Sequence, residues 1–147
     1  MFVCHGNICR SPMAEFIFKK KIAERGLSES FVVLSSATST EELGNPVYPP
    51  ARRELLSHGI NPDGKYAVQL ARRDYENYDL FVCMDSANVR NTLRIFGTDP
   101  CNKVKKLMDY TKKGGDVADP WYTGEFGVTY RDIDEGCDAL LDHLLKE

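Results

Sequence analysis

The chain has 147 residues, of which 42% are hydrophobic and 28% are charged. This length suits one domain with a buried core, and a net charge of −3 argues against a nucleic acid or an anionic membrane as the partner. No stretch reaches the roughly 18 apolar residues that a membrane span needs, and the start carries no export signal. We therefore expect a single, monomeric, cytoplasmic domain over residues 1–147.

The first half of the chain predicts alternating strands and helices. Residues 1–4 end a strand, and a helix is expected over about 11–25, with Ser11 as its N-cap and Pro12 in the first helical position. The β-branched run at 31–36 predicts a second, buried strand.

The rest of the chain continues the alternation. The expected elements are a helix at 51–58, one or two helical turns at 72–77, a buried strand at 79–84, a helix at 86–96, an edge strand at 103–108, a long loop at 109–127 and a final helix at 128–146. This order predicts an α/β fold: one doubly wound domain whose four-stranded, mostly parallel sheet has helices on both faces. Ligands of such sheets bind beyond the carboxyl ends of the strands, where the loop after residue 4 lies.

That loop, within VCHGNICRSP (residues 3–12), has the composition of an anion cradle. Its residues 5–10 include no proline, so every backbone N–H is available, and Gly6 and Asn7 readily adopt left-handed φ. Arg10 adds a planar fork that matches two phosphate oxygens. The positive potential of such a cradle favours the thiolate form of a cysteine at its floor, here Cys4. The loop therefore predicts nucleophilic attack on phosphorus or on a phosphate-like centre.

Other readings of the same residues are weaker. Cys4, His5 and Cys9 could ligate a metal, but a structural zinc site needs four ligands and no second Cys/His pair stands nearby. The Gly-Lys-Ser/Thr of a Walker loop is missing. The five cysteines are odd in number and irregular in spacing, which indicates reduced thiols. We expect no metal and no cofactor.

Residues 4–15, CHGNICRSPMAE, resemble the signature of the low-molecular-weight protein tyrosine phosphatases. Further stretches resemble that family in the family's order: Ser36-Ala37, His58-Gly59-Ile60, Cys83-Met84-Asp85, and Asp119-Pro120-Trp121-Tyr122-Thr123-Gly124. The resemblance spans essentially the whole chain. It implies a flavodoxin-like strand order of 2-1-3-4 and hydrolysis of phosphotyrosine in proteins, with inorganic phosphate or other oxyanions as product or inhibitor.

The resemblance also implies roles for individual residues. Cys4 would attack phosphorus to form a cysteinyl-phosphate, while Arg10 and the loop amides hold the phosphoryl oxygens. Asp119 would protonate the leaving phenol and then activate water. The phosphate-binding and substrate-binding set would comprise His5, Gly6, Asn7, Ile8, Cys9, Ser11, Trp121 and Tyr122.

Within that set, three positions have more particular implied roles. Asn7 would stabilise the shape of the loop. Ser11 would hydrogen-bond the thiolate, and the two aromatic residues Trp121 and Tyr122 would wall a slot for a phenyl ring.

The sequence departs from the family pattern in three places. The first strand is short, because Met1 lies only three residues before Cys4. Residues 65–69 read KYAVQ where the family commonly has a His and an Ala-Arg-Gln run. Residues 40–43 read TEEL, so an acidic loop would face the site, and it could favour basic residues next to the phosphotyrosine.

Rival functions stay open at this point. Family relatives that act on phosphoarginine carry Thr where this chain has Ile8. A thiol-dependent arsenate reductase would need two further relay cysteines, but Cys83 has an apolar strand pattern and Cys101 lies 18 residues beyond it. A catalytically silent phosphate-binding module is the third rival. A disulfide between Cys4 and Cys9 could also protect an oxidised nucleophile.

Overall fold

The computed structural model describes residues 1–146 and has a four-stranded parallel sheet with the strand order β2-β1-β3-β4. The strands are β1 (Phe2–Cys4), β2 (Ser35–Ala37), β3 (Phe81–Cys83) and β4 (Val104–Lys106). β1 pairs with β2 from Phe2↔Ser35 to Cys4↔Ala37, and β3 pairs with β1 and β4. The predicted α/β class, strand order and edge position of β4 are confirmed.

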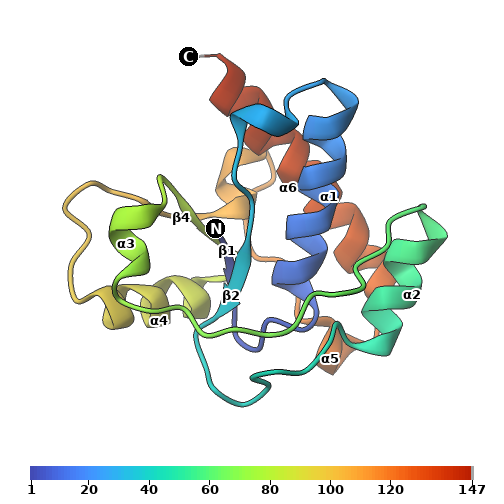
Figure 1. Ribbon diagram of the computed structural model, residues 1–147, viewed down its shortest axis with the longest axis horizontal. Coiled ribbons are helices and arrows are strands. Elements are labelled where there is room, and N and C mark those ends of the chain that lie inside the picture. Colours follow the sequence, from blue (N-terminus) through green and yellow to red (C-terminus); the bar gives the residue numbers. More distant parts are fainter. Residues whose placement is uncertain (147) are drawn as a thin grey trace.

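Helices cover both faces of the sheet. They are α1 (Arg10–Glu24), α2 (Pro49–Ser57), α3 (Asp74–Asn77), α4 (Ser86–Phe96), α5 (Pro120–Thr123) and α6 (Phe126–Leu145), with short 3₁₀ turns η1 (Ser28–Ser30) and η2 (Leu107–Tyr110). Figure 1 shows α1, α2 and α6 on one side of the sheet and α3 and α4 on the other. The fold is therefore doubly wound.

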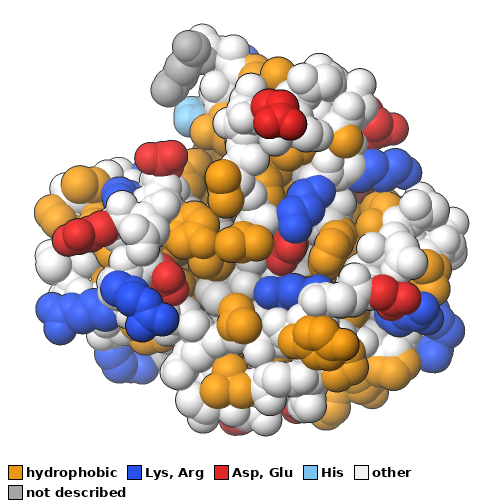
Figure 2. Space-filling view, viewed as in Figure 1, with side chains coloured by type: hydrophobic (Ala, Val, Ile, Leu, Met, Phe, Trp, Pro, Cys, Tyr) orange, Lys and Arg blue, Asp and Glu red, His pale blue; other side chains and the backbone are white. Residues whose placement is uncertain are grey.

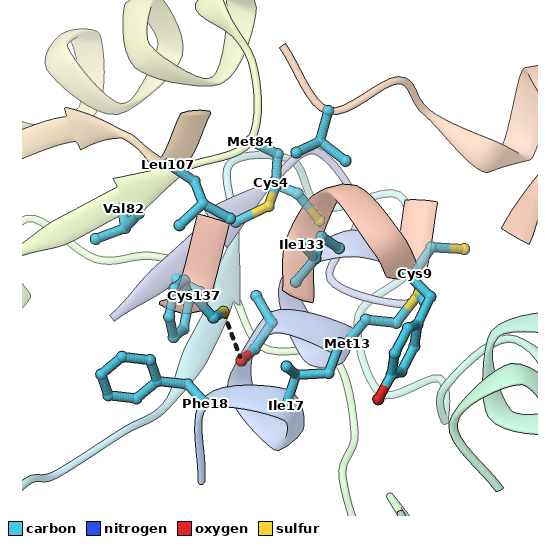
Figure 3. Close-up of a cluster of buried hydrophobic side chains, with 14 of the residues drawn as sticks. Cys4, Cys9, Met13, Ile17, Phe18, Val82, Met84, Leu107, Ile133 and Cys137 are labelled. Carbon is cyan, nitrogen blue, oxygen red and sulfur yellow. Dashed lines mark hydrogen bonds between the residues drawn. The ribbon is translucent and has the colours of Figure 1, made fainter. Parts of the chain in front are cut away.

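β1, β2 and β3 bury both of their faces because helices cover the two sides of the sheet, whereas the edge strand β4 buries only Val104 fully. The larger core cluster includes Phe2, Cys4 and Val82 together with α1 and α6, and Figure 3 shows Met13, Ile17, Ile133 and Cys137 in it. The smaller cluster takes the alternate strand residues and Phe96 of α4; its buried members are Val3, Leu70, Phe81, Cys83, Phe96 and Val104. Neighbouring residues of one strand thus serve two different cores.

The second strand differs from its prediction. It comprises Ser35–Ala37, whereas residues 31–34 are extended but outside the sheet, with 77% of Val32 exposed. The register explains the difference: β1 begins opposite Ser35, so the chain before Leu34 has no strand beside it to pair with. Hydrophobic side chains accordingly show at the surface in the middle of the face drawn in Figure 2, with charged side chains around them.

The start of the first helix is a second difference. α1 begins at Arg10 after Cys9, so the prediction of Ser11 as N-cap and Pro12 as first residue is wrong. The Ser11 hydroxyl contacts the Cys4 sulfur instead of a helix amide. The Ser11 hydroxyl therefore bonds a residue outside the helix rather than capping the helix.

Other boundaries move as well. α2 begins at Pro49 and α6 at Phe126, each two residues earlier than predicted, and the expected loop at 109–127 contains the end of η2 and all of α5. The strand expected over 103–108 is shorter, because residues 107 and 108 belong to η2, and the elements expected over 72–77 and 79–84 are trimmed to α3 and β3. Within residues 1–146 no helix is long and apolar enough to cross a membrane.

Candidate active site

The loop between β1 and α1 curls around the sulfur of Cys4. Asn7 has a φ of 59°, in the left-handed region, and this turn lets its own N–H donate to Cys4 Sγ at 3.3 Å. Among residues 1–146, the backbone N–H groups of Gly6, Ile8 and Cys9 have no protein acceptor. The loop thus offers several free donors around one thiol, which is the arrangement of an anion-binding nest.

Arg10 is buried beside this loop and is held from two directions. Its Nη1 donates to Asp85 Oδ2 at 2.7 Å and to the carbonyl oxygen of Val117 at 2.9 Å. Burial alone would lower the pKa of Arg10, but the neighbouring Cys4, Asp85 and Asp119 raise it above its ordinary value. The guanidinium is therefore a fixed positive charge with a set orientation.

Asp119, from the C-terminal part of the chain, lies beside Arg10 at the loop. It precedes Pro120, has extended backbone angles and caps α5, accepting a hydrogen bond at Oδ1 from the N–H of Trp121 at 3.0 Å. Its Oδ2 lies 3.4 Å from Arg10 Nη2. The side chain is 28% exposed, so one carboxylate stands at the boundary between the cradle and solvent.

These groups line one pocket of about 120 Å³. Its lining residues are Cys4, His5, Gly6, Asn7, Ile8, Cys9, Arg10, Glu41, Glu42, Asp119, Trp121 and Tyr122. Trp121 packs on Tyr48 with ring centroids 4.9 Å apart, while Tyr122 is 85% exposed at the mouth. A flat aromatic group could therefore enter between the Trp121 side and the loop.

An acidic rim lies on the pocket wall formed by Glu41 and Glu42. His5 Nε2 is 2.9 Å from Glu41 Oε2, and Asn45 donates to Glu42 Oε2 at 2.6 Å. Both pairs are exposed, so they contribute little to stability. Their effect is to place negative charge on this side of the pocket.

A second polar layer lies behind the loop. Ser11 Oγ is 3.0 Å from Cys4 Sγ and accepts from Asn7 Nδ2 at 2.7 Å. The same Asn7 nitrogen donates to Ser35 Oγ at 2.9 Å, and Asn7 Oδ1 accepts from the N–H of Val68 at 3.1 Å. The residues 65–69 that depart from the family pattern thus support Asn7 through the main chain.

The structure brings every sequence-predicted site residue into the pocket lining except Ser11, which is fully buried beneath it. Sequence reasoning did not assign Asp85, Tyr48, Ser35 or Glu15 to the site. Asp85 stood in a stretch that resembles the family, but its contact with Arg10 spans 75 residues and no local pattern reveals it.

A larger hollow, of about 400 Å³, lies elsewhere, at the amino ends of the strands around Met1, Phe31 and Leu80. The smaller pocket is the candidate active site because it gathers the thiol, the guanidinium and the carboxylate.

The other buried cysteines differ from Cys4 in their surroundings. Burial, with the nearby Cys4 and Asp119, raises the pKa of Cys9, so this side chain is a neutral thiol at neutral pH. Burial raises the pKa of Cys83 to about 12. Cys83 belongs to the smaller core cluster, and its sulfur contacts Thr92. Cys83 is therefore separated from Cys4 by the sheet.

The fold and the pocket together define a doubly wound α/β domain with a cysteine-bearing anion loop. Comparison with known proteins gives the same class. The sequence model of the family described as low molecular weight phosphotyrosine protein phosphatase matches residues 1–147. The low molecular weight protein-tyrosine-phosphatase YfkJ of Bacillus subtilis is 36% identical over 149 residues, covering 100% of this chain and 96% of that protein.

Two further relatives bear on the comparison. The low molecular weight phosphotyrosine protein phosphatase of Rattus norvegicus is 35% identical over 97% of this chain and 92% of its own. The crystal structure of YfkJ superposes with a TM-score of 0.95 over 99% of this chain and 92% of that one. That of a Drosophila arginine phosphatase gives 0.89 at 27% identity, covering 97% of this chain and 95% of that one. This chain belongs to the low-molecular-weight phosphotyrosine protein phosphatase family, whose members are cysteine-nucleophile hydrolases.

Proposed function

We propose that this chain hydrolyses phosphotyrosine in proteins through a cysteinyl-phosphate intermediate, and that one domain over residues 1–147 carries the whole activity. The observation that carries the proposal is the meeting of Cys4, Arg10 and Asp119 in one pocket. A silent phosphate-binding module would need the guanidinium and the amides, but it would need neither a thiol at the floor nor a carboxylate at the mouth.

In the first step the Cys4 thiolate attacks phosphorus and the bond to the phenol oxygen breaks. The phosphoryl oxygens lie against the loop amides from His5 to Arg10, where the Arg10 fork neutralises the developing charge. Asp119 donates a proton to the departing phenol oxygen. The contact between Asp119 and Arg10 supports this, because it holds the carboxyl beside the group that binds the phosphoryl oxygens.

In the second step a water molecule attacks the cysteinyl-phosphate and the thiolate leaves. Asp119, now a carboxylate, accepts the proton of that water. The Ser11 hydroxyl, 3.0 Å from Cys4 Sγ, stabilises the returning negative charge on sulfur. The product is inorganic phosphate, which the same donors bind, so phosphate and similar oxyanions act as inhibitors.

The walls of the pocket favour phosphotyrosine over phosphoarginine. Trp121, supported by Tyr48, offers a ring face, and the branched Ile8 side chain occupies the loop position where phosphoarginine-directed relatives carry a threonine. Phosphoserine and phosphothreonine have stems too short to carry phosphorus down to Cys4. The Drosophila arginine phosphatase shares the fold, so the fold alone does not decide the substrate.

An arsenate reductase function receives less support. A relay of disulfides would have to start from Cys4 and reach another thiol, but Cys83 is buried in the other core cluster. The exposed Cys101 belongs to the segment between α4 and β4, outside the pocket lining.

The remaining parts of the proposal concern partners and place. The partners are phosphotyrosine-bearing proteins. We propose a monomer in the cytoplasm, where a free thiol nucleophile stays reduced.

Matched phosphotyrosine, phosphoarginine and phosphoserine peptides test the function. We expect kcat/KM to be highest for phosphotyrosine, to survive a metal chelator and to vanish in Cys4→Ser. Ile8→Thr should shift the preference toward phosphoarginine. Equal or better turnover of phosphoarginine by the unmodified chain would overturn the substrate assignment, and loss of activity in chelator would overturn the thiolate mechanism.

A further inference from the structure

The polar layer behind the loop continues inward to a buried carboxylate. Ser35 Oγ donates to Glu15 Oε1 at 2.7 Å, and Glu15 is only 2% exposed. Buried carboxylates are costly unless they are paired. Lys19 Nζ lies 2.6 Å from Glu15 Oε2, and Lys65 Nζ lies 3.7 Å from Oε1. With donors on both oxygens, Glu15 is the acceptor in each of these contacts.

Lys65 approaches this carboxylate from a separate segment of the chain. Its Nζ also donates to the main-chain oxygen of Ser35 at 2.8 Å, and its side chain is 11% exposed. Burial lowers the pKa of Lys65, and the nearby Glu15 opposes that change. Burial lowers the pKa of the Met1 amino group to about 6, so the cations that pair with Glu15 at neutral pH are Lys19 and Lys65. Because Lys65 contacts both the Ser35 main chain and the Glu15 carboxylate, it holds these two residues in place relative to each other.

The direction of every hydrogen bond between Glu15 and Cys4 follows from the two ends. At one end the Val68 N–H can only donate, so it holds Asn7 Oδ1 and turns both Nδ2 hydrogens toward Ser35 and Ser11. At the other end the Glu15 carboxylate takes the single hydrogen of Ser35.

Ser11 completes the chain of bonds. Its oxygen accepts from Asn7, so its own single hydrogen is free for the Cys4 sulfur. If the Asn7 amide were turned over, its oxygen would lie between two hydroxyls and could take the hydrogens of both Ser11 and Ser35. Glu15 removes that alternative by committing the Ser35 hydrogen elsewhere.

We infer that Glu15, braced by Lys65, is a positioning residue that acts through Ser35 and Asn7 to reserve the Ser11 hydrogen for the Cys4 thiolate. It touches neither the substrate nor the sulfur. The charged groups that face the sulfur itself, Arg10 and Asp119, belong to the front of the pocket. The inference deepens the proposed function and rests on Cys4 acting as a thiolate.

The test is the rate at which iodoacetamide alkylates Cys4 as a function of pH, which needs no phosphatase activity. In Glu15→Met, which removes the acceptor at similar volume, we expect the half-point of the alkylation curve to move about one unit to higher pH. That is about a tenfold slower reaction at acidic pH. The acidic limb of kcat/KM for an aryl phosphate should move with it. Glu15→Gln keeps an acceptor oxygen for Ser35 and should restore most of the wild-type curve.

Controls separate positioning from general damage. Glu24→Gln makes a like change at an exposed position of the same helix and should leave the curve unmoved. In a Ser35→Ala background, Glu15→Met should add no further shift, because the connection is already cut.

Two results would overturn the inference: a Glu15→Met curve that coincides with wild type, or an equal shift in the Ser35→Ala background. A shifted alkylation curve in a protein without phosphatase activity would instead reject the proposed function and leave the inference standing.

Discussion

The two sides of the phosphate loop are built differently. The front presents Cys4, the free amides, Arg10 and a partly exposed Asp119 to a small open pocket. The back is a buried chain of hydrogen bonds through Asn7, whose amide nitrogen donates to Ser11 and Ser35 and whose oxygen accepts from Val68. The groups at the front can change their hydrogen-bond partners as substrate binds and reacts. The network at the back keeps the loop in one conformation throughout. Substitutions on the two sides should therefore fail in different ways.

The largest difference is expected from Asp119→Ala, at the front. kcat should fall by about 10²–10⁴ for phenyl phosphates with poor leaving groups, and by less for good ones, because a good leaving group needs no proton. A plot of kcat against leaving-group acidity checks this. An equal loss across all leaving groups would show that Asp119 serves the structure and that the acid lies elsewhere.

Asp85→Asn changes the residue that holds Arg10, a front residue, from behind. The neutral amide weakens the 2.7 Å charge-assisted bond to Arg10, so the guanidinium is less firmly aimed and kcat/KM should fall about tenfold. Asp116→Asn, at a carboxylate that pairs with Lys106, is the matched control. If both variants behave alike, the aiming of Arg10 by Asp85 is not needed.

Cys9 tests whether the loop protects its own nucleophile. Because its pKa is raised, Cys9 should stay a thiol and react only after Cys4 has been oxidised to a sulfenic acid. Peroxide should then inactivate the enzyme in a way that a dithiol reverses, and Cys9→Ser should recover a smaller fraction of its activity. Full recovery of Cys9→Ser would contradict a protective disulfide.

The smallest effect is expected from the acidic rim. Replacing Glu41 and Glu42 together by Gln should lower kcat/KM for phosphotyrosine peptides with flanking lysines or arginines by about three- to tenfold. Peptides with neutral flanks should be unaffected, and added salt should erase the difference. A loss that is the same for both peptide types would show that the rim shapes the loop rather than selecting substrates.

The sequence was most informative where function and local geometry coincide. The strand-to-helix loop, its left-handed Asn7 and the extended Asp119 could be predicted because each depends on residues close together in the chain. The parallel sheet could be predicted from the alternation of strands and helices along the chain. Ser11 misled the prediction because Ser-Pro is a typical helix start. Its hydroxyl instead has a sulfur partner seven residues back, which local propensity does not register.

Contacts over longer separations could not be predicted. No residue near Asp85 in the sequence indicates that Asp85 binds Arg10. The contacts of Lys65 with residues 15 and 35 are likewise visible only in the folded structure. The run at 31–36 predicted a strand from its composition, but pairing depends on where the neighbouring strand begins. Side-chain type states what a residue can do, while the fold decides which partner it meets.

The central claim is that Cys4 becomes phosphorylated during turnover. Rapid acid quenching of the enzyme with an aryl phosphate, followed by peptide mapping, measures this directly. The account predicts a phosphoryl group on Cys4 in the wild-type chain and none in Cys4→Ser, with leaving phenol released in an initial burst where the second step is slow. Turnover with no phosphoryl group on Cys4, or with the group on another residue, would contradict it.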